Sequence, residues 1–331
     1  MEISNLKDLS TKLKNLIDIS ENIAVASHLN PDGDNLGSVT AMIGLLVKLG
    51  KKPVFILDDS IPSSFKFLPN LSYAKNPDEI DYEVDLFIAL DSSDEDRMGD
   101  NVKEIFSKSR KTANIDHHFS NKKYADLNIV DDKSPATCEI LARIFKSLNL
   151  ELNKEIAMSL FTGLSTDTGS FKYSSVTSDT FSTASDLFKY DVDINEVTVN
   201  VYQSRSRQKT DLLIRAMNSI EYFDDDRIAV VFVTKDDMEI TKAAKADADG
   251  IVEFVRDIDT VELAVLLKEK DDCIRLSLRS KSFIDCTEIA SKFNGGGHIR
   301  ASGGTIYSTD LEKAKRDVVK FAEEQLWWMD F

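Results

Sequence analysis

The first half of the chain alternates between apolar residues at helical spacing and short, unbroken apolar runs. A helical pattern covers residues 5–19, and apolar runs cover residues 23–26, 53–57, 84–90 and 112–115. Runs of this length between polar turns predict buried strands, and the segments that separate them are helical or irregular. Strands that alternate with helices predict an α/β fold with a doubly wound, mainly parallel sheet.

Three further helices are predicted beside these strands. A helical apolar pattern opens at Ser38. Ser134 and Pro135 suit the N-cap and the first helical position of a second helix. A third pattern covers residues 154–164 and places Asp167 at the carboxyl end of its helix.

The pattern changes in the second half of the chain. Residues 178–222 are mostly helical, and apolar runs at 228–233, 261–267 and 274–278 predict strands of a second, smaller α/β unit. Helices are predicted between these strands and again over residues 311–326.

The length of 331 residues is sufficient for two domains, each with its own core. The predicted division places a first domain at residues 1–190, a helical linker at 191–210 and a second domain at 211–331. Trp327 and Trp328 are predicted to pack against the protein or to form a dimer contact.

The charge of the chain excludes some partners. With 41 basic and 57 acidic residues, the net charge is −16. A protein this acidic repels long polyanions, which argues against a protein that binds duplex DNA. A small phosphorylated substrate is still allowed, because divalent cations reverse the sign of the field within a site.

The cysteines and the amino terminus indicate the compartment. Cys138, Cys273 and Cys286 are odd in number and far apart, which argues against a disulfide framework and for a reducing cytoplasm. We expect no membrane span, because no apolar run is long enough, and no signal peptide, because the first residues lack an apolar core. The prediction is a cytoplasmic protein.

Histidines and aspartates gather where predicted elements end. A turn of Asp residues can form without any ligand, because Asp side chains bond their own backbone. All but one of the four histidines of the chain lie at strand ends beside aspartates, however, and the carboxyl ends of parallel strands meet at one edge of the sheet. The residues expected to meet in one cleft are His28, Asp32, Asp34, Asp91, His117 and Asp167.

These side chains are typical of a metal site. Imidazole and carboxylate ligands without thiolate suit manganese, magnesium, iron or cobalt better than structural zinc. Six such groups are too many for one ion with an open position, but they suit two ions that share a carboxylate. Two ions of this kind favour the hydrolysis of a phosphate ester.

The order of the motifs resembles a known family. HLNPDGD, LDSSD, NIDHHFS and STDTGSF follow one another, and IRLSLRSK precedes NGGGHIRASGG. This pattern resembles the DHH phosphoesterase family with its DHH-associated C-terminal domain, in the branch of nano-RNases and adenosine bisphosphate phosphatases. The resemblance implies a catalytic first domain, a substrate-binding second domain and an active cleft between them.

The resemblance also implies roles for individual residues. A first ion would be held by His28, Asp32 and Asp91, and a second by Asp34, Asp91, His117 and Asp167. The expected cofactor is two Mn²⁺, with Mg²⁺ or Co²⁺ as substitutes. His118 would face the scissile phosphate, and Asp116 would support a histidine ligand.

Candidate substrate contacts lie in both halves. The set comprises Arg97, Arg275, Arg279, Gly295, Gly296, Gly297 and His298. A glycine run is also common in plain turns, and the two arginines of the second domain also suit surface charges on one side of a strand. The chain departs from the family pattern at Asn294, where a fourth glycine is usual, and at Ser302, where a second alanine is usual.

The resemblance implies an enzyme that hydrolyses short RNA or DNA oligonucleotides and adenosine 3′,5′-bisphosphate. Alternatives are a phosphodiesterase for cyclic or linear dinucleotides, such as cyclic di-AMP or pApA, and a non-catalytic nucleotide-binding regulator. A pyrophosphatase of the same superfamily is disfavoured, because its C-terminal domain lacks the GGGH element. The chain is also a candidate homodimer.

Overall fold

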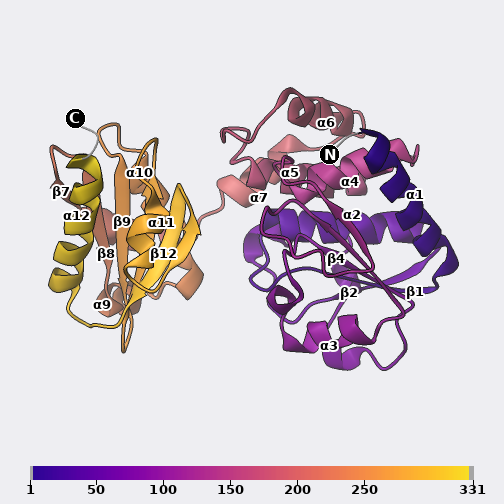
Figure 1. The fold of residues 1–331 in the computed structure, drawn as a ribbon, viewed down its shortest axis with the longest axis horizontal. Helices are drawn as coiled ribbons and strands as arrows, with labels where there is room; N and C mark the ends of the chain where they lie inside the picture. Colours follow the sequence, from indigo (N-terminus) through magenta and orange to yellow (C-terminus); the bar gives the residue numbers. More distant parts are fainter. Residues whose placement is uncertain (1–2, 328–331) are drawn as a thin grey trace. The chain divides into compact units, whose positions relative to one another are not determined.

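A computed structural model describes residues 3–327 and divides the chain into two compact units between Ser204 and Arg205. Figure 1 shows both units. The division falls inside the range 191–210, which the sequence predicts as the linker. Each unit is an α/β structure, so the predicted fold class is confirmed.

The first unit contains a six-stranded sheet in the order β3-β2-β1-β4-β5-β6. Every neighbouring pair of strands is parallel, as predicted for a doubly wound sheet. The short strands β3 and β6 were not predicted. The strands are β1 (Asn22–Ala26), β2 (Lys52–Ile56), β3 (Ala74–Lys75), β4 (Leu86–Leu90), β5 (Lys111–Asp116) and β6 (Leu127–Val130).

Helices cover both faces of this sheet. Figure 1 shows α3 below the sheet and α2, α4 and α5 above it. The helices are α1 (Ile3–Ile19), α2 (Gly33–Lys48), α3 (Asp100–Lys108), α4 (Thr137–Ser147), α5 (Lys154–Asp167), α6 (Ser178–Phe188) and α7 (Ile194–Tyr202). Short 3₁₀ turns lie at η1 (Ser63–Phe65), η2 (Leu71–Tyr73), η3 (Pro77–Glu79) and η4 (Glu95–Met98).

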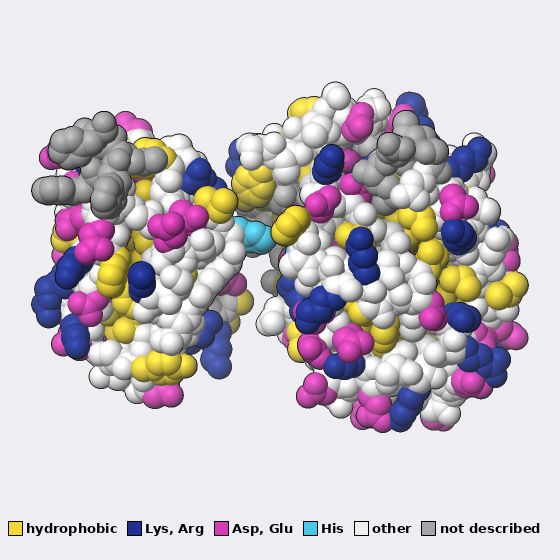
Figure 2. Space-filling model, in the orientation of Figure 1, with side chains coloured by type: hydrophobic (Ala, Val, Ile, Leu, Met, Phe, Trp, Pro, Cys, Tyr) yellow, Lys and Arg dark blue, Asp and Glu magenta, His cyan; other side chains and the backbone are white. Residues whose placement is uncertain are grey.

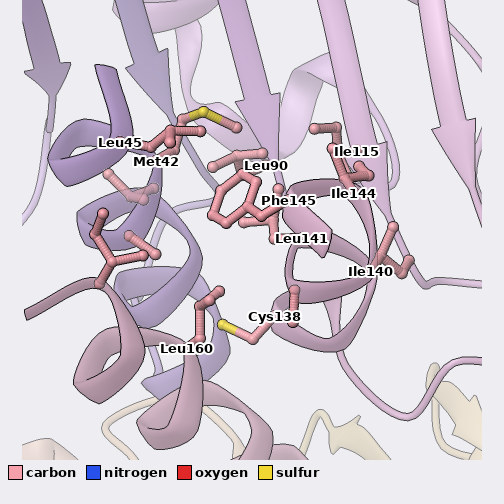
Figure 3. Packing of buried hydrophobic residues seen from close by; sticks show 14 of the residues in the cluster. Met42, Leu45, Leu90, Ile115, Cys138, Ile140, Leu141, Ile144, Phe145 and Leu160 are labelled. Carbon is pink, nitrogen blue, oxygen red and sulfur yellow. The ribbon is translucent and has the colours of Figure 1, made fainter. Parts of the chain in front are cut away.

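The larger core lies between the sheet and α2, α4 and α5 (Figure 3). Met42 of α2, Leu90 of β4, Ile115 of β5 and Phe145 of α4 are all fully buried there. Burial of side chains of this size stabilises the fold by about 1.5–3 kcal/mol each. The core therefore holds the last residues of β4 and β5, and so fixes where the chain leaves the sheet.

The strand order reverses between β1 and β4. The chain runs outward from β1 to β2 and β3, and then returns to pair β4 with the other side of β1. In open α/β sheets, ligands bind at the carboxyl ends of the strands that flank such a switch point. The residues that follow β1 and β4 are therefore the first place to look for a site.

Two predicted helix starts are wrong. α2 begins at Gly33, not Ser38, because the Asp32 side chain accepts a hydrogen bond from Asn35 N at 3.0 Å and caps the helix five residues earlier. α4 begins at Thr137, and its N-cap residue is Ala136 rather than Ser134.

The start of α4 has a tertiary cause. The Ser134 hydroxyl donates to the carbonyl of Ala136 at 3.0 Å and so does not cap the helix. The amides of Thr137 and Cys138 donate instead to the Asp34 carboxylate, at 2.6 and 2.9 Å. A side chain from another helix therefore provides the cap that local sequence rules assign to Ser134.

The second unit contains a mixed six-stranded sheet in the order β11-β12-β10-β9-β8-β7. β8 and β9 are parallel, and the other neighbours are antiparallel. The strands are β7 (Glu221–Phe223), β8 (Ile228–Val233), β9 (Leu263–Glu269), β10 (Ile274–Ser280), β11 (Gly296–His298) and β12 (Ala301–Ile306). β8, β9 and β10 match predicted strands, with β9 shifted by two residues, whereas β7, β11 and β12 were not predicted.

Helices pack on both faces of the second sheet. α11 and α12 contribute to one hydrophobic cluster, and α8 and α10 contribute to another. The helices are α8 (Arg207–Asn218), α9 (Lys235–Thr241), α10 (Ile251–Arg256), α11 (Cys286–Ser291) and α12 (Leu311–Trp327), with a 3₁₀ turn at η5 (Lys245–Ala248). The prediction for the Trp327 and Trp328 side chains lies outside the described residues. Within residues 3–327, no helix has the length and apolar character needed to cross a membrane.

Candidate metal centre

Three strand ends and two helix ends bring the predicted chemistry together. His28 follows β1, Asp91 follows β4 and His117 follows β5, while Asp34 starts α2 and Asp167 ends α5. The side chains form three overlapping groups with donor atoms in ligand spacing: His28, Asp32 and Asp91; Asp34, His117 and Asp167; and Asp91, His117 and His118.

Asp91 belongs to two of these groups, and His117, which also belongs to two, joins them to the remaining one. Asp91 Oδ2 lies 3.4 Å from His28 Nε2, and its Oδ1 lies 3.5 Å from His117 Nε2. Two ligands about 2.1 Å from one ion and at right angles to each other are about 3 Å apart. The two oxygens of one carboxylate thus face two histidines at a spacing that suits shared coordination.

Asp32 and Asp167 extend the cluster on its two sides. Asp167 Oδ2 lies 3.2 Å from His117 Nε2, and Asp32 Oδ2 lies 3.9 Å from His28 Nε2. Asp32 uses Oδ1 to cap α2, so its other oxygen faces His28. Helix capping therefore sets the orientation of one candidate ligand.

Backbone carbonyls orient the two histidines. His28 Nδ1 lies 2.8 Å from Leu29 O, and His117 Nδ1 lies 3.3 Å from Ser134 O. A carbonyl oxygen only accepts hydrogen bonds, so Nδ1 is the donor in both pairs. In the neutral form, each Nε2 then presents a lone pair to the cluster, as metal-ligating histidines usually do.

Asp34 and Asp91 are almost fully buried. Asp34 receives the two amide bonds from the first turn of α4, whose positive end favours an anion. Asp91 accepts a hydrogen bond from Thr137 Oγ1 at 3.1 Å and has a φ of +52°. Left-handed backbone at a residue other than glycine is uncommon, although Asp tolerates it, and it turns the chain sharply at the end of β4.

The crowding of carboxylates perturbs the pKa values of the cluster. Burial, together with the Asp167 carboxylate, raises the pKa of Asp34 to about 7, and burial beside Asp34 raises the pKa of Asp91. Burial alone would lower the pKa of His117, but the hydrogen bond with Asp167 and the neighbouring carboxylates raise this pKa to about 10. The cluster therefore retains protons that a cation would displace.

We expect the metal-free protein to lose stability as the pH rises through neutrality. A carboxyl whose folded pKa is raised stabilises the fold at low pH, and Asp34 loses that contribution between its ordinary pKa near 4 and its folded pKa of about 7. His117 loses its contribution as the pH rises from about 6.5 towards 10. A divalent ion replaces these protons, so the rise in Tm on adding Mn²⁺ should be larger at about pH 8 than at about pH 5.5.

Thermal unfolding of chelator-treated protein, with and without excess Mn²⁺, measures this difference across the pH range. A metal-induced rise in Tm of the same size at both pH values would contradict the assignment of these residues to a metal site.

His118 is held differently from the other two histidines. Its Nδ1 lies 2.7 Å from Asp116 Oδ1, and Asn121 Nδ2 donates to Asp116 Oδ2 at 2.6 Å. Although burial opposes ionisation, these hydrogen bonds keep the pKa of Asp116 below its ordinary value. His118 Nδ1 also lies 3.8 Å from Asp91 Oδ1, but this nitrogen is already bound to Asp116. The nitrogen of His118 that is free for a ligand is therefore Nε2.

The backbone of Arg97 is hydrogen-bonded to the segment that carries His28. Arg97 belongs to η4, its side chain is exposed, and its carbonyl accepts a hydrogen bond from Leu29 N at 2.8 Å. The segment that carries Arg97 is thus fastened to the residue that follows His28.

The other predicted contacts lie in the second unit. Arg275 and Arg279 alternate with buried residues of β10 and share one side of the strand, as expected. Both are engaged within the unit, since Arg279 Nε donates to Glu253 Oε1 at 2.8 Å and Arg275 Nη1 donates to Thr305 Oγ1 at 2.7 Å. His298 is exposed at the end of β11.

Gly295, Gly296 and Gly297 differ in whether the fold requires a glycine at their position. A Cβ at Gly295 would lie 2.0 Å from Gly303 O, and one at Gly297, where φ is +145°, would lie 2.6 Å from Ala301 O. Packing of the β11–β12 hairpin therefore requires both. A Cβ at Gly296 would meet no atom within 4 Å, so this is the one glycine of the three at which the fold would accept a side chain, although all three are exposed. Asn294 is left-handed, with φ of +51°, which explains how Asn can occupy a glycine position.

Sequence reasoning missed the residues that support the cluster. Thr137 binds both Asp34 and Asp91, and Asn35 Nδ2 donates to His28 O at 2.8 Å. Asn121 binds Asp116, and lies five residues after it, directly behind the motif NIDHHFS. Asn35 and Asn121 each directly follow a motif, whereas Thr137 lies outside the motifs, at the start of α4.

Comparison with protein families finds two matches. The model of the DHH family, N-terminal domain, matches residues 22–164, and that of the DHHA1 domain matches residues 225–327. The first match contains all the residues of the three candidate metal-binding groups except Asp167. The second match contains β10 and the β11–β12 hairpin.

Relatives and solved structures cover most of the chain. The chain is 29% identical to a bifunctional oligoribonuclease and PAP phosphatase NrnA of Thermus thermophilus, over 92% of this chain and 90% of the relative. It is 30% identical to a probable protein of the same name from Streptococcus mutans, over 87% and 90%. A crystal structure of an exopolyphosphatase-related protein from Bacteroides fragilis superposes with a TM-score of 0.88 at 25% identity, over 95% and 96%.

Proposed function

Because this chain belongs to the DHH family of phosphoesterases, we propose that it hydrolyses short oligonucleotides and adenosine 3′,5′-bisphosphate with the help of divalent cations. The observation that carries this proposal is the Asp91 carboxylate, whose two oxygens lie 3.4 and 3.5 Å from His28 and His117. The names of the NrnA relatives support the choice of substrates.

The donor set supports two ions. His28, Asp32 and Asp91 would hold the first, and Asp34, Asp91, His117 and Asp167 would hold the second. Oxygen and imidazole donors without thiolate suit Mn²⁺, with Mg²⁺ or Co²⁺ as substitutes. Cations bound here would lower the pKa of water and stabilise the negative charge that develops around phosphorus.

The other residues of the first unit would position the substrate and move a proton. His118 would present Nε2 to a phosphate oxygen, because Asp116 holds its Nδ1. The hydrogen bonds from His118 and Asn121 keep the pKa of Asp116 below its ordinary value, and Asn121 also holds the carboxylate that fixes the His118 ring in this orientation. A rigid imidazole of this kind suits hydrogen bonding or proton transfer to the reacting group.

The second unit would bind the part of the substrate that does not react. Its candidates are Arg275, Arg279, His298 and the exposed backbone of Gly295, Gly296 and Gly297. Arg279 has Nε bound to Glu253 and Nη1 bound to Leu278 O, which leaves Nη2 available to a phosphate. Arginine suits this role because its planar fork donates several bonds at once.

We expect Arg279→Ala to raise KM for nucleotides about ten- to a hundredfold, as for the loss of a charged hydrogen bond, and to leave kcat and Mn²⁺ affinity unchanged. Steady-state kinetics with a metal titration measure both quantities. Glu253→Gln is the matched control, because it weakens the ion pair but keeps the guanidinium. Equal losses of Tm in both variants with unchanged KM would show that Arg279 is only structural.

The acidic charge should restrict the length of the substrate. On the face shown in Figure 2, acidic and basic side chains are interspersed over the described surface of each unit, without a continuous basic band. With a net charge of −16, we expect turnover to fall steeply from dinucleotides to single strands of about 20 nucleotides or more.

A turnover panel with Mn²⁺ tests the proposed function. It contains a ribodinucleotide, a pentanucleotide, a long single strand, adenosine 3′,5′-bisphosphate, cyclic di-AMP and pyrophosphate. Preference for the dinucleotide and the bisphosphate supports the proposal, whereas equal turnover of the long strand contradicts the restriction on length. No turnover of any of them would favour a nucleotide-binding regulator.

We also propose that the protein works in a reducing cytoplasm. Its three cysteines are free thiols, and two of them, Cys138 and Cys286, are buried.

A further inference from the structure

We propose that Phe119 is a stacking surface for a nucleobase of the substrate. Its side chain is 89% exposed, more than any other large apolar side chain among the described residues. It directly follows His118, whose free Nε2 is the proposed phosphate contact. The inference rests on the proposed function, because it takes the substrate to be a nucleotide.

The turn that carries Phe119 is fixed from behind. Asn121 N donates to His118 O at 3.1 Å, which closes a turn with Phe119 inside it. The Asn121 side chain donates to Asp116 at 2.6 Å and to Asn114 at 2.8 Å. Asn121 therefore holds both the turn and the Asp116 carboxylate that orients the His118 ring. The exposed Phe119 ring contributes little to packing.

This combination distinguishes Phe119 from an ordinary exposed apolar residue. Single apolar side chains at the surface are common and need no explanation. Here, however, the backbone is held by buried polar residues, and adjacent Cα atoms lie only about 3.8 Å apart, so Phe119 stays next to His118. Because the backbone of the turn is already fixed, only the side-chain torsions of Phe119 have to be ordered when a ligand binds.

The chemistry suits a base. Every nucleobase has a π-face that stacks on an aromatic ring, so recognition of this kind tolerates any base. An uncharged ring also gains contact area beside an acidic cluster without adding repulsion for the phosphate. A nucleotide with its phosphate at His118 would have its base within reach of the neighbouring ring.

Equilibrium binding tests the inference apart from turnover. Calorimetry would measure the affinity for AMP and for ribose 5-phosphate, which lacks the base, in saturating Mn²⁺. The variants are Phe119→Ala, Phe119→Leu and Phe119→Trp. Tyr82→Ala is the matched control, because Tyr82 is also exposed but precedes β4, at the opposite end of that strand from Asp91.

We expect Phe119→Ala to weaken AMP binding about five- to a hundredfold, as for the loss of one base–aromatic stack. Binding of ribose 5-phosphate should be unchanged. Phe119→Leu should behave like the alanine variant, Phe119→Trp should bind AMP at least as tightly as the native protein, and Tyr82→Ala should have no effect. Tm should be nearly constant throughout, because the ring is exposed.

Two outcomes would overturn the inference. One is unchanged AMP affinity in Phe119→Ala, and the other is equal weakening for AMP and ribose 5-phosphate, which would indicate a disturbed site rather than a lost stack. Failure of the proposed function is a separate result, because a native protein that binds AMP through Phe119 but cleaves no oligonucleotide would contradict hydrolysis alone.

Discussion

Asp91→Asn should abolish most of the metal-dependent turnover while leaving the fold intact. The Asp91 carboxylate lies between His28 and His117, so its loss removes the proposed shared ligand. Metal-ion stabilisation of several kcal/mol corresponds to a fall in kcat of about a thousandfold or more. Kinetics over a range of Mn²⁺ concentrations would measure it.

Asparagine is the most conservative replacement for Asp91 that removes the charge. It keeps the shape of the side chain and tolerates the left-handed backbone at φ of +52°. Since Asp91 is buried beside other carboxylates that raise its pKa, the neutral variant should unfold at a Tm no lower than that of the native metal-free protein. It should also lose most of the rise in Tm that Mn²⁺ produces.

The control is Asp8→Asn, which removes an exposed carboxylate that pairs with Lys12 on the surface of α1. It should leave turnover and metal response unchanged, because exposed ion pairs contribute little. A folded Asp91→Asn protein with near-normal turnover would show that the two-ion assignment is wrong.

His118→Asn should lower kcat about a hundred- to ten-thousandfold, the range for loss of a positioned acid–base group. The asparagine amide can still donate to Asp116, as His118 Nδ1 does, but the variant lacks Nε2. Affinity for Mn²⁺ and the metal-induced rise in Tm should stay close to the native values. Single-turnover kinetics and a metal titration would separate these quantities.

Asn121→Ala tests the support of His118 separately, because it removes the hydrogen bond to Asp116 and keeps both His117 and His118. Loss of such a supporting hydrogen bond should cost about ten- to a hundredfold in activity. If His118→Asn instead loses Mn²⁺ binding, then His118 is a metal ligand, and the third group of Asp91, His117 and His118 is the relevant one.

The fold was predictable where the apolar pattern was strong. The buried runs of β1, β4 and β8 stood out because every residue in them except Asn22, at the start of β1, is apolar. β3 has only two residues, and the β11–β12 hairpin is rich in glycine, which weakens any strand pattern. These strands form because neighbouring strands and helices hold them, so a local pattern does not reveal them.

The grouping of His28, Asp91 and His117 followed from the sequence by itself. Each of them follows a predicted strand, and in a parallel sheet the carboxyl ends of neighbouring strands meet at one edge. Strand pattern and residue type were therefore sufficient to predict a cluster of imidazoles and carboxylates, and the structure brings these groups within ligand spacing.

Only the tertiary structure decided how these groups are held. The Asp34 carboxylate caps α4 by accepting a hydrogen bond from the amide of Thr137, which lies 103 positions further along the chain. Asn121 binds Asp116, which holds the His118 ring, and also closes the turn that exposes Phe119. Arg279 proved to be paired with Glu253, and Gly296 proved to be the one glycine of its run with room for a Cβ. Hydrogen bonds and close contacts of this kind depend on which distant segments pack together, whereas patterns along a sequence report only on near neighbours and on the periodicity of burial.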